Sequence, residues 1–337
     1  MAAARKTRWR GRALRIALRL LGPVLLLVVL WRIDDPAALW QTLARAEPWA
    51  LAAALALNVV VIHLKVVRWQ VLLRAAGHRY GTGRGWRALV ASLYVGMLTP
   101  GRVGDVLRIQ YTRHDLGVPY AEGLAVIVMD RLCDMYVLVA FVAAGAARFA
   151  SVLTGKLGLA MWLGVLLTTV LPLVLFVPGL AERLGGRLYA RLSPRRDAAG
   201  LERFLAALRA QVSRSLWLAV PLTVAGFAVN YLQGWLIGES LGLGLSWFDA
   251  MSLMAVTSLL GLLPISVSGV GVRELFMALA FPVIGLAAES GVAFGLVVFA
   301  VLYLALILAG FVAWQVAPPP FAPRAAANEE QGPGAGD

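Results

Sequence analysis

The chain has 337 residues, of which 60% are hydrophobic and only 15% are charged, and its mean hydropathy is +0.78. A soluble domain cannot hide that much apolar surface in its core. The composition therefore excludes an ordinary soluble enzyme and predicts an all-α, polytopic membrane helix bundle. The formal net charge of +13 does not indicate a nucleic-acid partner, because the basic residues follow the expected membrane topology rather than one soluble face.

Apolar stretches of membrane-spanning length recur along the chain. A hydrocarbon core of about 30 Å requires about 20 apolar residues in a helix. On this criterion we expect about six full spans, near residues 14–31, 48–73, 119–147, 157–178, 215–240 and 287–316. Two further apolar stretches, 88–113 and 248–282, are interrupted by proline, glycine and charged residues. The basic N-terminus lacks a small-residue cleavage site, so we expect the first span to be retained.

Arginine is concentrated in three segments, 5–19, 74–87 and 183–214. Because cytoplasmic loops carry an excess of Lys and Arg, we expect these segments on the cytoplasmic side, together with both termini. The segment 32–47 is then external. The sequence predicts a multi-pass protein of the bacterial cell (inner) membrane.

The cytoplasmic segments 74–87 and 183–214 enclose three apolar stretches, yet an even number of crossings must join them. We therefore expect the interrupted stretch 88–113 to enter from the cytoplasm and return there. By the same reasoning, 248–282 should enter from outside and return outside. Irregular backbone at membrane depth is tolerated only where protein or a water-filled cavity satisfies its hydrogen bonds. The two re-entrant hairpins are thus predicted to meet in such a cavity.

Two opposed hairpins would fit an inverted repeat, with halves 48–147 and 215–316 joined by the arginine-rich segment 183–214. Each half has an asparagine ahead of its hairpin, Asn58 and Asn230. Chance similarity between two apolar halves explains this as well as common descent does, so the repeat remains open. We expect one membrane domain over residues 1–316 and a disordered tail over 317–337, which is rich in Pro, Ala and Gly.

The first hairpin contains the segment YVGMLTPGRVGDVLR. Thr99 and Pro100 would form an N-cap and first-turn pair that starts a half-helix at membrane depth. Arg102, Asp105 and Arg108 follow at i, i+3 and i+6, which places them on roughly one helix face.

The second hairpin contains LLPISVSGVGVRE. Ser266 or Ser268 would cap a half-helix that starts near Gly269 and carries Arg273 and Glu274. A helix N-terminus presents unpaired N–H groups and partial positive charge, and such an end binds anions. The sequence thus predicts an anion site at this hairpin.

Further charges lie inside the expected spans. Asp130 and Asp134 are i, i+4 neighbours beside Arg131, while Lys65 and Arg68 lie near the inner end of the span 48–73. Each charge at the bilayer centre costs about 2.5–3.5 kcal/mol on insertion scales, so these groups must face one another or water. Purely structural pairs are the alternative, namely Arg102 with Asp130, Arg131 with Asp105 and Arg273 with Glu274. For Asp134 and Lys65, structural and functional roles are equally open.

The candidate substrate-binding residues are Asn58, Lys65, Arg102, Asp105, Arg108, Asp130, Arg131, Ser266, Ser268, Gly269, Arg273 and Glu274. We expect no cofactor or metal, because Cys133 is the single cysteine and the chain has only three histidines.

Four segments, LKVVRWQVLL, YVGMLTPGRVGDVLR, MDRLCD and LLPISVSGVGVRE, occur in this order. They resemble the transmembrane domain of the lysylphosphatidylglycerol synthase/flippase family, also called flippase-like or UPF0104 proteins, over about residues 14–316. The family pattern has Asn or a similar polar residue before the proline of the first hairpin, where this chain has Leu98 and Thr99. We expect a stand-alone membrane domain without the family's synthase domain.

The resemblance implies translocation of a lipid with a polar headgroup. The implied lipid partners are an anionic or aminoacylated phospholipid, a polyprenyl-phosphate-linked lipid or a hopanoid-type lipid. Our first hypothesis is a flippase-like lipid transporter in which Arg102, Arg108 and Arg273 hold a phosphate. Asp105, Asp130 and Glu274 would then balance these arginines or accept a proton.

Two other hypotheses remain open. An integral-membrane glycosyl- or phosphotransferase would use Asp34 and Asp35 as its acidic pair. An accessory subunit would instead support a separate lipid-modifying or glycosyltransferase enzyme. The sequence contains no nucleotide-binding, zinc-protease or serine-hydrolase motif, so we expect that the chain is not an enzyme.

Overall fold

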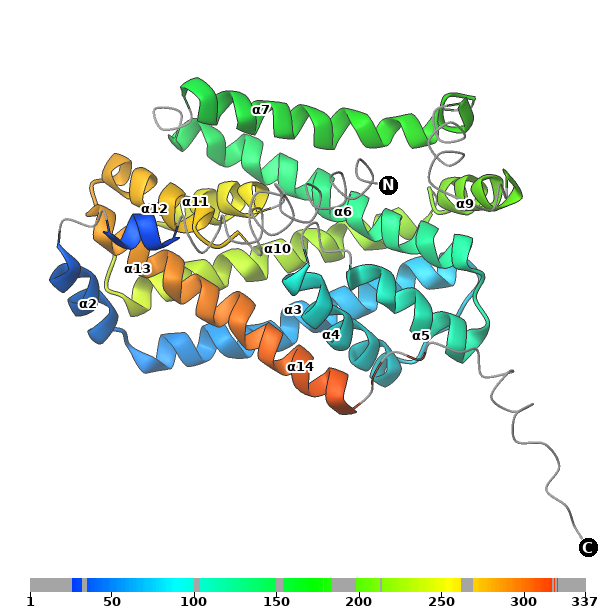
Figure 1. Ribbon diagram of the computed structural model, residues 1–337, viewed down its shortest axis with the longest axis horizontal. Coiled ribbons are helices and arrows are strands. Elements are labelled where there is room, and N and C mark those ends of the chain that lie inside the picture. The colour runs from blue at the N-terminus through cyan, green and yellow to red at the C-terminus, as the bar shows by residue number, and fades with distance from the viewer. Residues whose placement is uncertain are drawn as a thin grey trace, which may run out of the picture.

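The computed structural model describes residues 26–31, 35–99, 104–149, 154–177, 179–183, 198–212, 214–261 and 269–316, with single positions at 318 and 320. Within these ranges every regular element is a helix (Figure 1). The prediction of an all-α, polytopic membrane protein is therefore confirmed. Most of the expected first span, and nearly all of the tail 317–337, lie outside the described residues.

Within the described residues, three helices are long and apolar enough to cross a membrane. They are α3 (Pro48–Ala75), α10 (Arg214–Ser240), and a continuous helix made of α13 (Ala288–Val298), a π-helical segment (Phe299–Leu304) and α14 (Ala305–Val316). They correspond to the spans expected at 48–73, 215–240 and 287–316.

Two other expected spans form less regular helices. Helix α6 (Tyr120–Ala146) occupies the stretch 119–147 and carries several charges at its centre. Helix α7 (Gly155–Val170) continues as the 3-10 segment η3 (Leu171–Phe176), in which Pro172 is at the start. Proline removes a backbone donor and clashes with the preceding turn, so the regular α-helix ends there. The apolar part of this element, Trp162–Phe176, is shorter than the three long helices.

Both interrupted stretches fold as pairs of short helices, as their sequences predict. The first pair is α4 (Thr82–Leu98) and α5 (Leu107–Leu116), and the second is α11 (Trp247–Leu260) and α12 (Val272–Ala280). Below we call these pairs the first and second hairpins.

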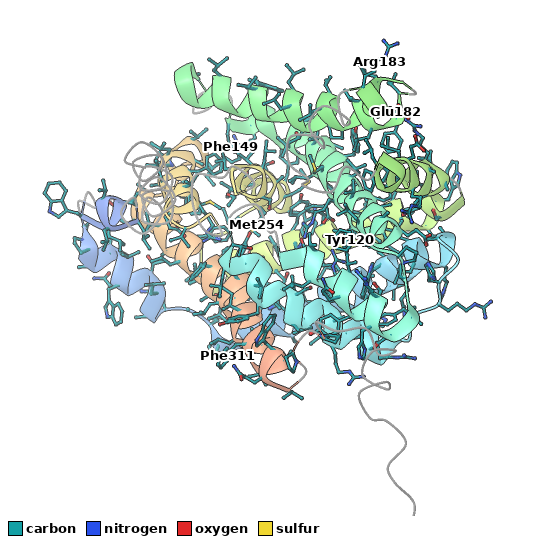
Figure 2. The ribbon with its side chains drawn as sticks, turned by 45° about the vertical axis from the view of Figure 1, so that its right-hand side comes forward. Tyr120, Phe149, Glu182, Arg183, Met254 and Phe311 are labelled. Atoms are coloured by element: carbon teal, nitrogen blue, oxygen red, sulfur yellow. The ribbon has the colours of Figure 1, made fainter. Side chains whose placement is uncertain are left out.

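Two smaller helices cover the ends of the bundle. Helix α2 (Pro36–Ala44) packs against α13, and α9 (Ala198–Ala210) packs against α6. The buried Leu205 and Leu208 attach α9, and Arg209 donates to Glu182 at 2.9 Å. Figure 2 shows Glu182 at the end of the bundle where α9 lies.

Helices from distant parts of the chain pack against one another. Helix α3 packs along α10 (Figure 1). Helix α4 of the first hairpin packs against α14, and α11 of the second hairpin packs against α6. The first arm of each hairpin therefore rests on a long helix from the other end of the chain.

The arms of each hairpin meet at a pair of glycines. A Cβ atom on Gly104 would overlap the backbone of Gly96, so the residue at 104 must lack a side chain. In the second hairpin, a Cβ on Gly269 would lie 3.3 Å from the Cα of Gly261, and Gly269 has φ +75°. Backbone contact at these glycines brings the two arms together.

We expect the Gly104→Ala variant to lose about 1–3 kcal/mol of stability, because the added methyl overpacks a backbone contact. The measurement is thermal unfolding of the purified protein in detergent. Gly83→Ala is the matched control, because Gly83 lies in α4 with open space where its Cβ would be. Equal melting temperatures for the two variants would show that the glycine contact does not hold the first hairpin.

Candidate functional site

A cavity of about 430 Å³ lies among α3, α4, α6, α7, α10, α11 and the helix that contains residues 299–316. The end of α4 contributes Gly96 and Thr99 to its wall, and the end of α11 contributes Ser258 and Gly261. The structure thus brings the ends of both hairpins to one cavity.

Four charged side chains line this cavity within the described residues. Lys65 and Arg68 come from α3, while Arg131 and Asp134 come from α6. The side chain of Arg131 is 26% exposed, compared with 3% for Arg68. The wall therefore presents three cations against one carboxylate, and Arg131 is the more accessible of the two arginines.

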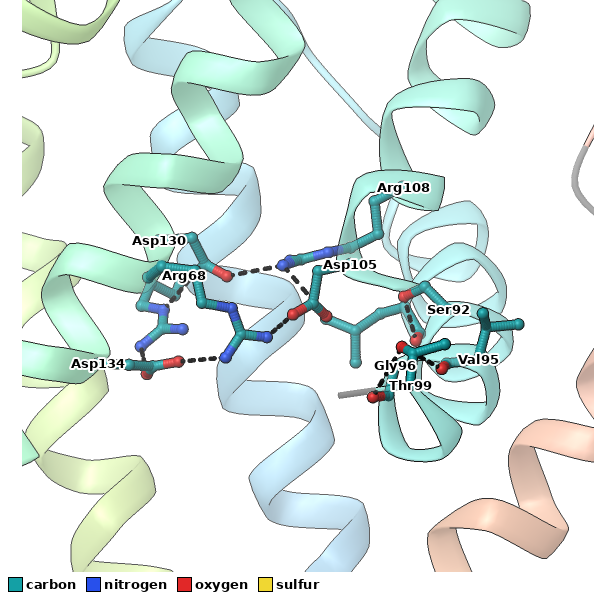
Figure 3. Close-up of polar contacts among 11 residues, drawn as sticks. Arg68, Ser92, Val95, Gly96, Thr99, Asp105, Arg108, Asp130 and Asp134 are labelled. Carbon is teal, nitrogen blue, oxygen red and sulfur yellow. Dashed lines mark hydrogen bonds and ion pairs between the residues drawn. The ribbon is translucent and has the colours of Figure 1, made fainter. Parts of the chain in front are cut away.

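Arg68 is held by partners from two other helices (Figure 3). Its Nε donates to Asp130 at 2.7 Å, and its Nη1 donates to Asp134 at 2.5 Å. Nη1 also donates to the hydroxyl of Thr223 on α10 at 2.8 Å. These bonds fix the guanidinium at the junction of α3, α6 and α10.

The same carboxylates connect Arg68 to the first hairpin. Arg108 of α5 donates to Asp130 at 3.0 Å, lies 3.8 Å from Asp105 and stacks over the ring of Trp69. Asp105 also pairs with Arg131, whose guanidinium is 3.6 Å from Asp134. Three arginines and three aspartates thus form one connected network, which joins α3, the first hairpin and α6. We call these six residues the ion-pair network.

Balanced charge explains how the ion-pair network is tolerated among apolar helices. An isolated buried charge costs several kcal/mol, whereas a paired and hydrogen-bonded one recovers much of that cost. The expected pair of Arg131 with Asp105 is confirmed. The pair of Arg102 with Asp130 cannot be assessed, since Arg102 lies outside the described residues, and Asp130 bonds instead to Arg68 and Arg108.

We expect Asp130→Asn to destabilise the protein by about 3–5 kcal/mol, because it leaves Arg68 and Arg108 short of a buried counter-charge. Thermal unfolding in detergent measures this loss. The control is Glu122→Gln, which removes a partly exposed contact with His78 and should cost no more than about 1 kcal/mol. If the two variants unfold at the same temperature, the network does not stabilise the bundle.

The second hairpin holds its charges differently. Helix α12 begins at Val272 after Gly271, and the Glu274 carboxylate accepts from the Gly271 N–H at 2.6 Å and from Arg273 at 3.0 Å. The expected Arg273–Glu274 pair is confirmed. The prediction that a serine caps this helix near Gly269 is wrong, because Gly271 is the N-cap residue and Glu274 supplies the capping carboxylate. Ser266 and Ser268 lie outside the described residues.

Arg273 lies behind the cavity wall rather than on it. Its guanidinium lies 5.3 Å from the ring centre of Phe299 and 4.8 Å from that of Tyr303. Arg273 and Glu274 are each 1% exposed, and neither lines the cavity, whereas Tyr303 does. Among the described residues, the ring of Tyr303 connects Arg273 to the cavity wall.

The prediction that Thr99 and Pro100 start a half-helix is also wrong for Thr99, the one of the two that the structure describes. Thr99 is the C-cap of α4, and its hydroxyl donates back to the carbonyl of Val95 at 2.8 Å. The second arm starts later, with a short 3-10 turn at 104–106 that leads into α5. A hydroxyl next to proline is typical of a helix start, but here it bonds the preceding turn instead. Pro100 lies outside the described residues.

Asn58 serves packing between helices. Its amide donates to the carbonyl of Val301 at 2.8 Å and accepts from Gln233 at 3.2 Å. Val301 is in the π-helical segment, where the backbone hydrogen bonds depart from the regular α-helical pattern. Asn58 therefore supplies a donor to a backbone carbonyl of that segment. Asn58 does not line the cavity, whereas Asn230 of the other half does.

Several cavity residues were not among the sequence candidates, namely Arg68, Thr223, Asn230, Ser258 and Tyr303. Thr223 and Asn230 are polar residues seven positions apart in an apolar span, which places them on one helix face. That spacing was the sequence signal that could have identified these two residues as cavity residues. Tyr303 gave no such signal, because an aromatic residue in a membrane span most often packs against apolar neighbours.

Of the acidic pair proposed for an enzyme, Asp35 alone lies within the described residues. The carboxylate of Asp35 accepts from the N–H of Ala38 at 3.0 Å and so caps α2. Asp34 lies outside the described residues. The structure gives Asp35 a structural role.

At the end of α5, Asp115 ties the first hairpin to the loop that follows α3. It accepts from the hydroxyl of Tyr80 at 2.8 Å and contacts His114 at 2.9 Å. Burial opposes ionisation of Asp115, but these bonds hold its pKa below the ordinary value. Burial, together with the bond to Asp115, raises the pKa of Tyr80. The pair stays as phenol and carboxylate near neutral pH.

The long apolar helices and the charged internal cavity define a polytopic helical membrane protein with a buried polar site. The chain belongs to the family described as the lysylphosphatidylglycerol synthase TM region, whose model matches residues 16–310. This match confirms the resemblance carried by the four sequence motifs.

Two relatives are informative. The chain is similar to a UPF0104 membrane protein of Methanothermobacter thermautotrophicus, with 20% identity over 286 residues, covering 78% of this chain and 81% of that protein. It is also similar to Glycosyltransferase AglD of Haloferax volcanii, with 30% identity over 124 residues. That match covers 37% of this chain and only 20% of the relative.

Proposed function

We propose that this chain is a lipid transporter, not an enzyme, that moves a lipid with a phosphate-bearing headgroup between the leaflets of a bacterial cell membrane. The headgroup passes through the cavity while the hydrocarbon chains stay in the bilayer. The observation that carries the proposal is the position of Lys65 and Arg131 on the cavity wall, where Lys65 adds a positive charge to the balanced ion-pair network. A cleft with excess positive charge concentrates anions, and guanidinium groups match phosphate geometry.

The roles differ from those expected from the sequence. Arg108 and Arg273 are buried behind the wall, so in our proposal they position other groups and do not hold the phosphate. Lys65 and Arg131, which line the cavity, take over that role. Asp105 and Asp130 balance the arginines.

The proposal includes two re-entrant hairpins that enter from opposite faces and an inverted repeat, with both termini cytoplasmic. The reciprocal packing of α4 on α14 and α11 on α6 supports the repeat. So does a shared spacing of glycine, seven residues, glycine, three residues and arginine, which ends at Arg108 in one hairpin and at Arg273 in the other. Both arginines are buried and lie over aromatic rings.

Cysteine labelling tests the topology. In a Cys133→Ala background, Gly83→Cys and Arg113→Cys should react with a membrane-impermeant thiol reagent from the cytoplasmic face only. Phe248→Cys and Ala287→Cys should react from the external face only. All four positions are exposed and flank the hairpins. Labelling of one pair from opposite faces would make that hairpin a true span.

A charge-balanced double variant tests the binding role of Arg131. In proteoliposomes, Arg131→Gln should slow translocation of a tail-labelled phosphatidylglycerol at least tenfold, a change of about 1.4 kcal/mol in barrier. Arg131→Gln combined with Asp105→Asn removes both charges of the pair, so it should regain stability while transport stays slow. Recovery of transport in the double variant would make Arg131 purely structural.

The pair Arg148 and Asp249 offers the matched control. Their side chains lie 2.7 Å apart, and they do not line the cavity. Arg148→Gln with Asp249→Asn should leave transport unchanged, since it removes an ion pair that lies outside the cavity.

The alternative is an integral-membrane glycosyl- or phosphotransferase, or an accessory subunit of such an enzyme, that acts on a lipid-linked substrate. The similarity to AglD favours it. The match covers a fifth of that relative, and Asp35 is occupied as a helix cap, so the cavity supports transport better.

A further inference from the structure

We infer that an apolar groove between α6, α10 and η3 is a hydrocarbon-chain site, which holds one chain of the lipid whose headgroup occupies the cavity. The inference rests on the proposed transport function, and it gives a place to the part of the lipid that the cavity does not hold. It comes from a second concave surface, which lies beside the cavity and shares its walls. We call this surface the chain groove.

The chain groove has a volume of about 790 Å³. Helix α6 supplies its longest wall, from Met129 to Ala144, and the start of α10 and the segment η3 supply the others. Among the described lining residues, Cys133 and Tyr136 are the two with a polar side-chain group. The hydroxyl of Tyr136 already donates to the carbonyl of Thr169 at 3.0 Å. The chain groove therefore presents an apolar surface.

The third wall forms because α7 stops being a regular α-helix. Pro172 has no N–H to donate, and the chain continues from there as η3. The side chains of Leu173 and Phe176 in η3 line the chain groove. The bond from Tyr136 to the Thr169 carbonyl attaches the end of α7 to α6 just before this segment. That attachment holds η3 beside the groove.

The chain groove and the cavity are walled by the same helices. On α6, Leu138 lines the cavity and Val137 lines the groove. On α10, Phe227 lines the cavity and Val224 lines the groove. Helix α7 reaches the cavity at Thr168, shortly before η3 reaches the groove. The two spaces are therefore direct neighbours.

Side chains form the boundary between the two spaces. The ring centre of Phe141, which lines the groove, is 6.2 Å from that of Phe227, which lines the cavity. A Cβ atom on Gly226 would meet no neighbouring atom within 4 Å, so α10 is loosely packed at this turn. A lipid chain that leaves the cavity between α6 and α10 thus passes these two rings and enters the groove.

The chemistry and length of the chain groove select hydrocarbon as its occupant. An apolar concavity does not hold water, and an empty one loses the dispersion contacts that hydrocarbon provides. Met129 and Ala144 are 15 positions apart, which corresponds to about 22 Å along α6. One leaflet contributes about 15 Å of hydrocarbon to a bilayer. The groove is therefore long enough for one chain.

Attachment to the headgroup distinguishes this chain from those of the surrounding bilayer. Once the cavity holds the phosphate, the chain is tethered beside the groove, and its effective concentration there exceeds that of untethered chains. One wall of the groove is the start of α10, which follows the arginine-rich segment expected on the cytoplasmic side. The occupant is therefore a lipid of the cytoplasmic leaflet.

Photolabelling in proteoliposomes tests the occupancy. The probe is phosphatidylglycerol with a diazirine near the end of one chain, diluted in phosphatidylcholine. We expect label on residues 129–144 to exceed label on Leu163 and Leu166 at least threefold, because these two leucines are exposed on α7 at the edge of the bundle (Figure 1). Equal labelling would show bulk bilayer lipid only and would overturn the inference. Weaker labelling of 129–144 would show that something else fills the groove and would also overturn it.

The same probe tests the connection to the cavity. Arg131→Gln combined with Asp105→Asn removes a cavity cation without leaving an unpaired charge, so the headgroup is held less well. We expect labelling of residues 129–144 to fall at least threefold in this variant, while labelling of Leu163 and Leu166 stays the same. Unchanged labelling of 129–144 would show that the chain in the groove does not belong to a lipid bound in the cavity.

Filling the groove tests its role in transport. Ala140 and Ala143 are both exposed on α6, and of the two Ala140 lines the groove. Ala140→Trp should reduce the labelling of 129–144 and slow translocation of a tail-labelled phosphatidylglycerol at least tenfold. Ala143→Trp is the matched control and should leave both within twofold of the wild type.

The wall on α10 provides a second pair of variants if Ala140→Trp does not fold. Val220 is 40% exposed and lines the groove, whereas Leu218 is 60% exposed and does not. Val220→Trp should act as Ala140→Trp does, and Leu218→Trp should have no effect.

These measurements separate the chain groove from the transport function. If the wild type moves lipid, and folded groove variants keep its rate and its labelling, the inference is overturned and the transport function stands. If the wild type moves no lipid faster than protein-free vesicles, but Ala140→Trp removes the label, the transport function is overturned and the lipid-chain site stands.

Discussion

The ion pairs of Asp130 with Arg68 and Arg108 are the constraint on which the first half of the structure depends. One carboxylate on α6 bonds a guanidinium from α3 and another from α5. Because each charge would be costly alone in an apolar bundle, the three helices must adopt the single register in which all of them are paired. That register places α5 beside α6 and brings the end of α4 to the cavity.

The same network explains how a positive cavity coexists with balanced buried charge. Arg68 and Arg108 are 3% exposed and both bond Asp130, whereas Arg131 is 26% exposed and reaches Asp105 and Asp134 from the cavity wall. An anion can therefore approach Arg131 without breaking the bonds of Asp130. Stability and ligand attraction then depend on different arginines.

The sequence predicted the long helices and the two interruptions, because span length and Pro/Gly breaks are local properties. The alternative of purely structural pairs named Arg131–Asp105 and Arg273–Glu274, and both pairs are present in the structure. The sequence could not predict the partners of Asp130, since spacing along one helix does not fix the register between helices. The prediction that Arg273 binds a phosphate in the cavity was wrong for a related reason. Its position on α12 can be read from the local sequence, but the cavity is formed by helices that are distant in sequence.

The two hairpins differ in what holds them. In the second, Glu274 satisfies both the first N–H of α12 and the adjacent Arg273, so the start of the helix is self-contained. In the first, α5 has no side-chain cap, and Arg108 in its first turn pairs with Asp130 of α6 and lies over Trp69 of α3. Asp105, which precedes α5, pairs with Arg131 on the cavity wall, whereas Arg273 and Glu274 of α12 do not line the cavity. Of the two hairpins, the first is therefore the one that the ion-pair network connects to the cavity wall.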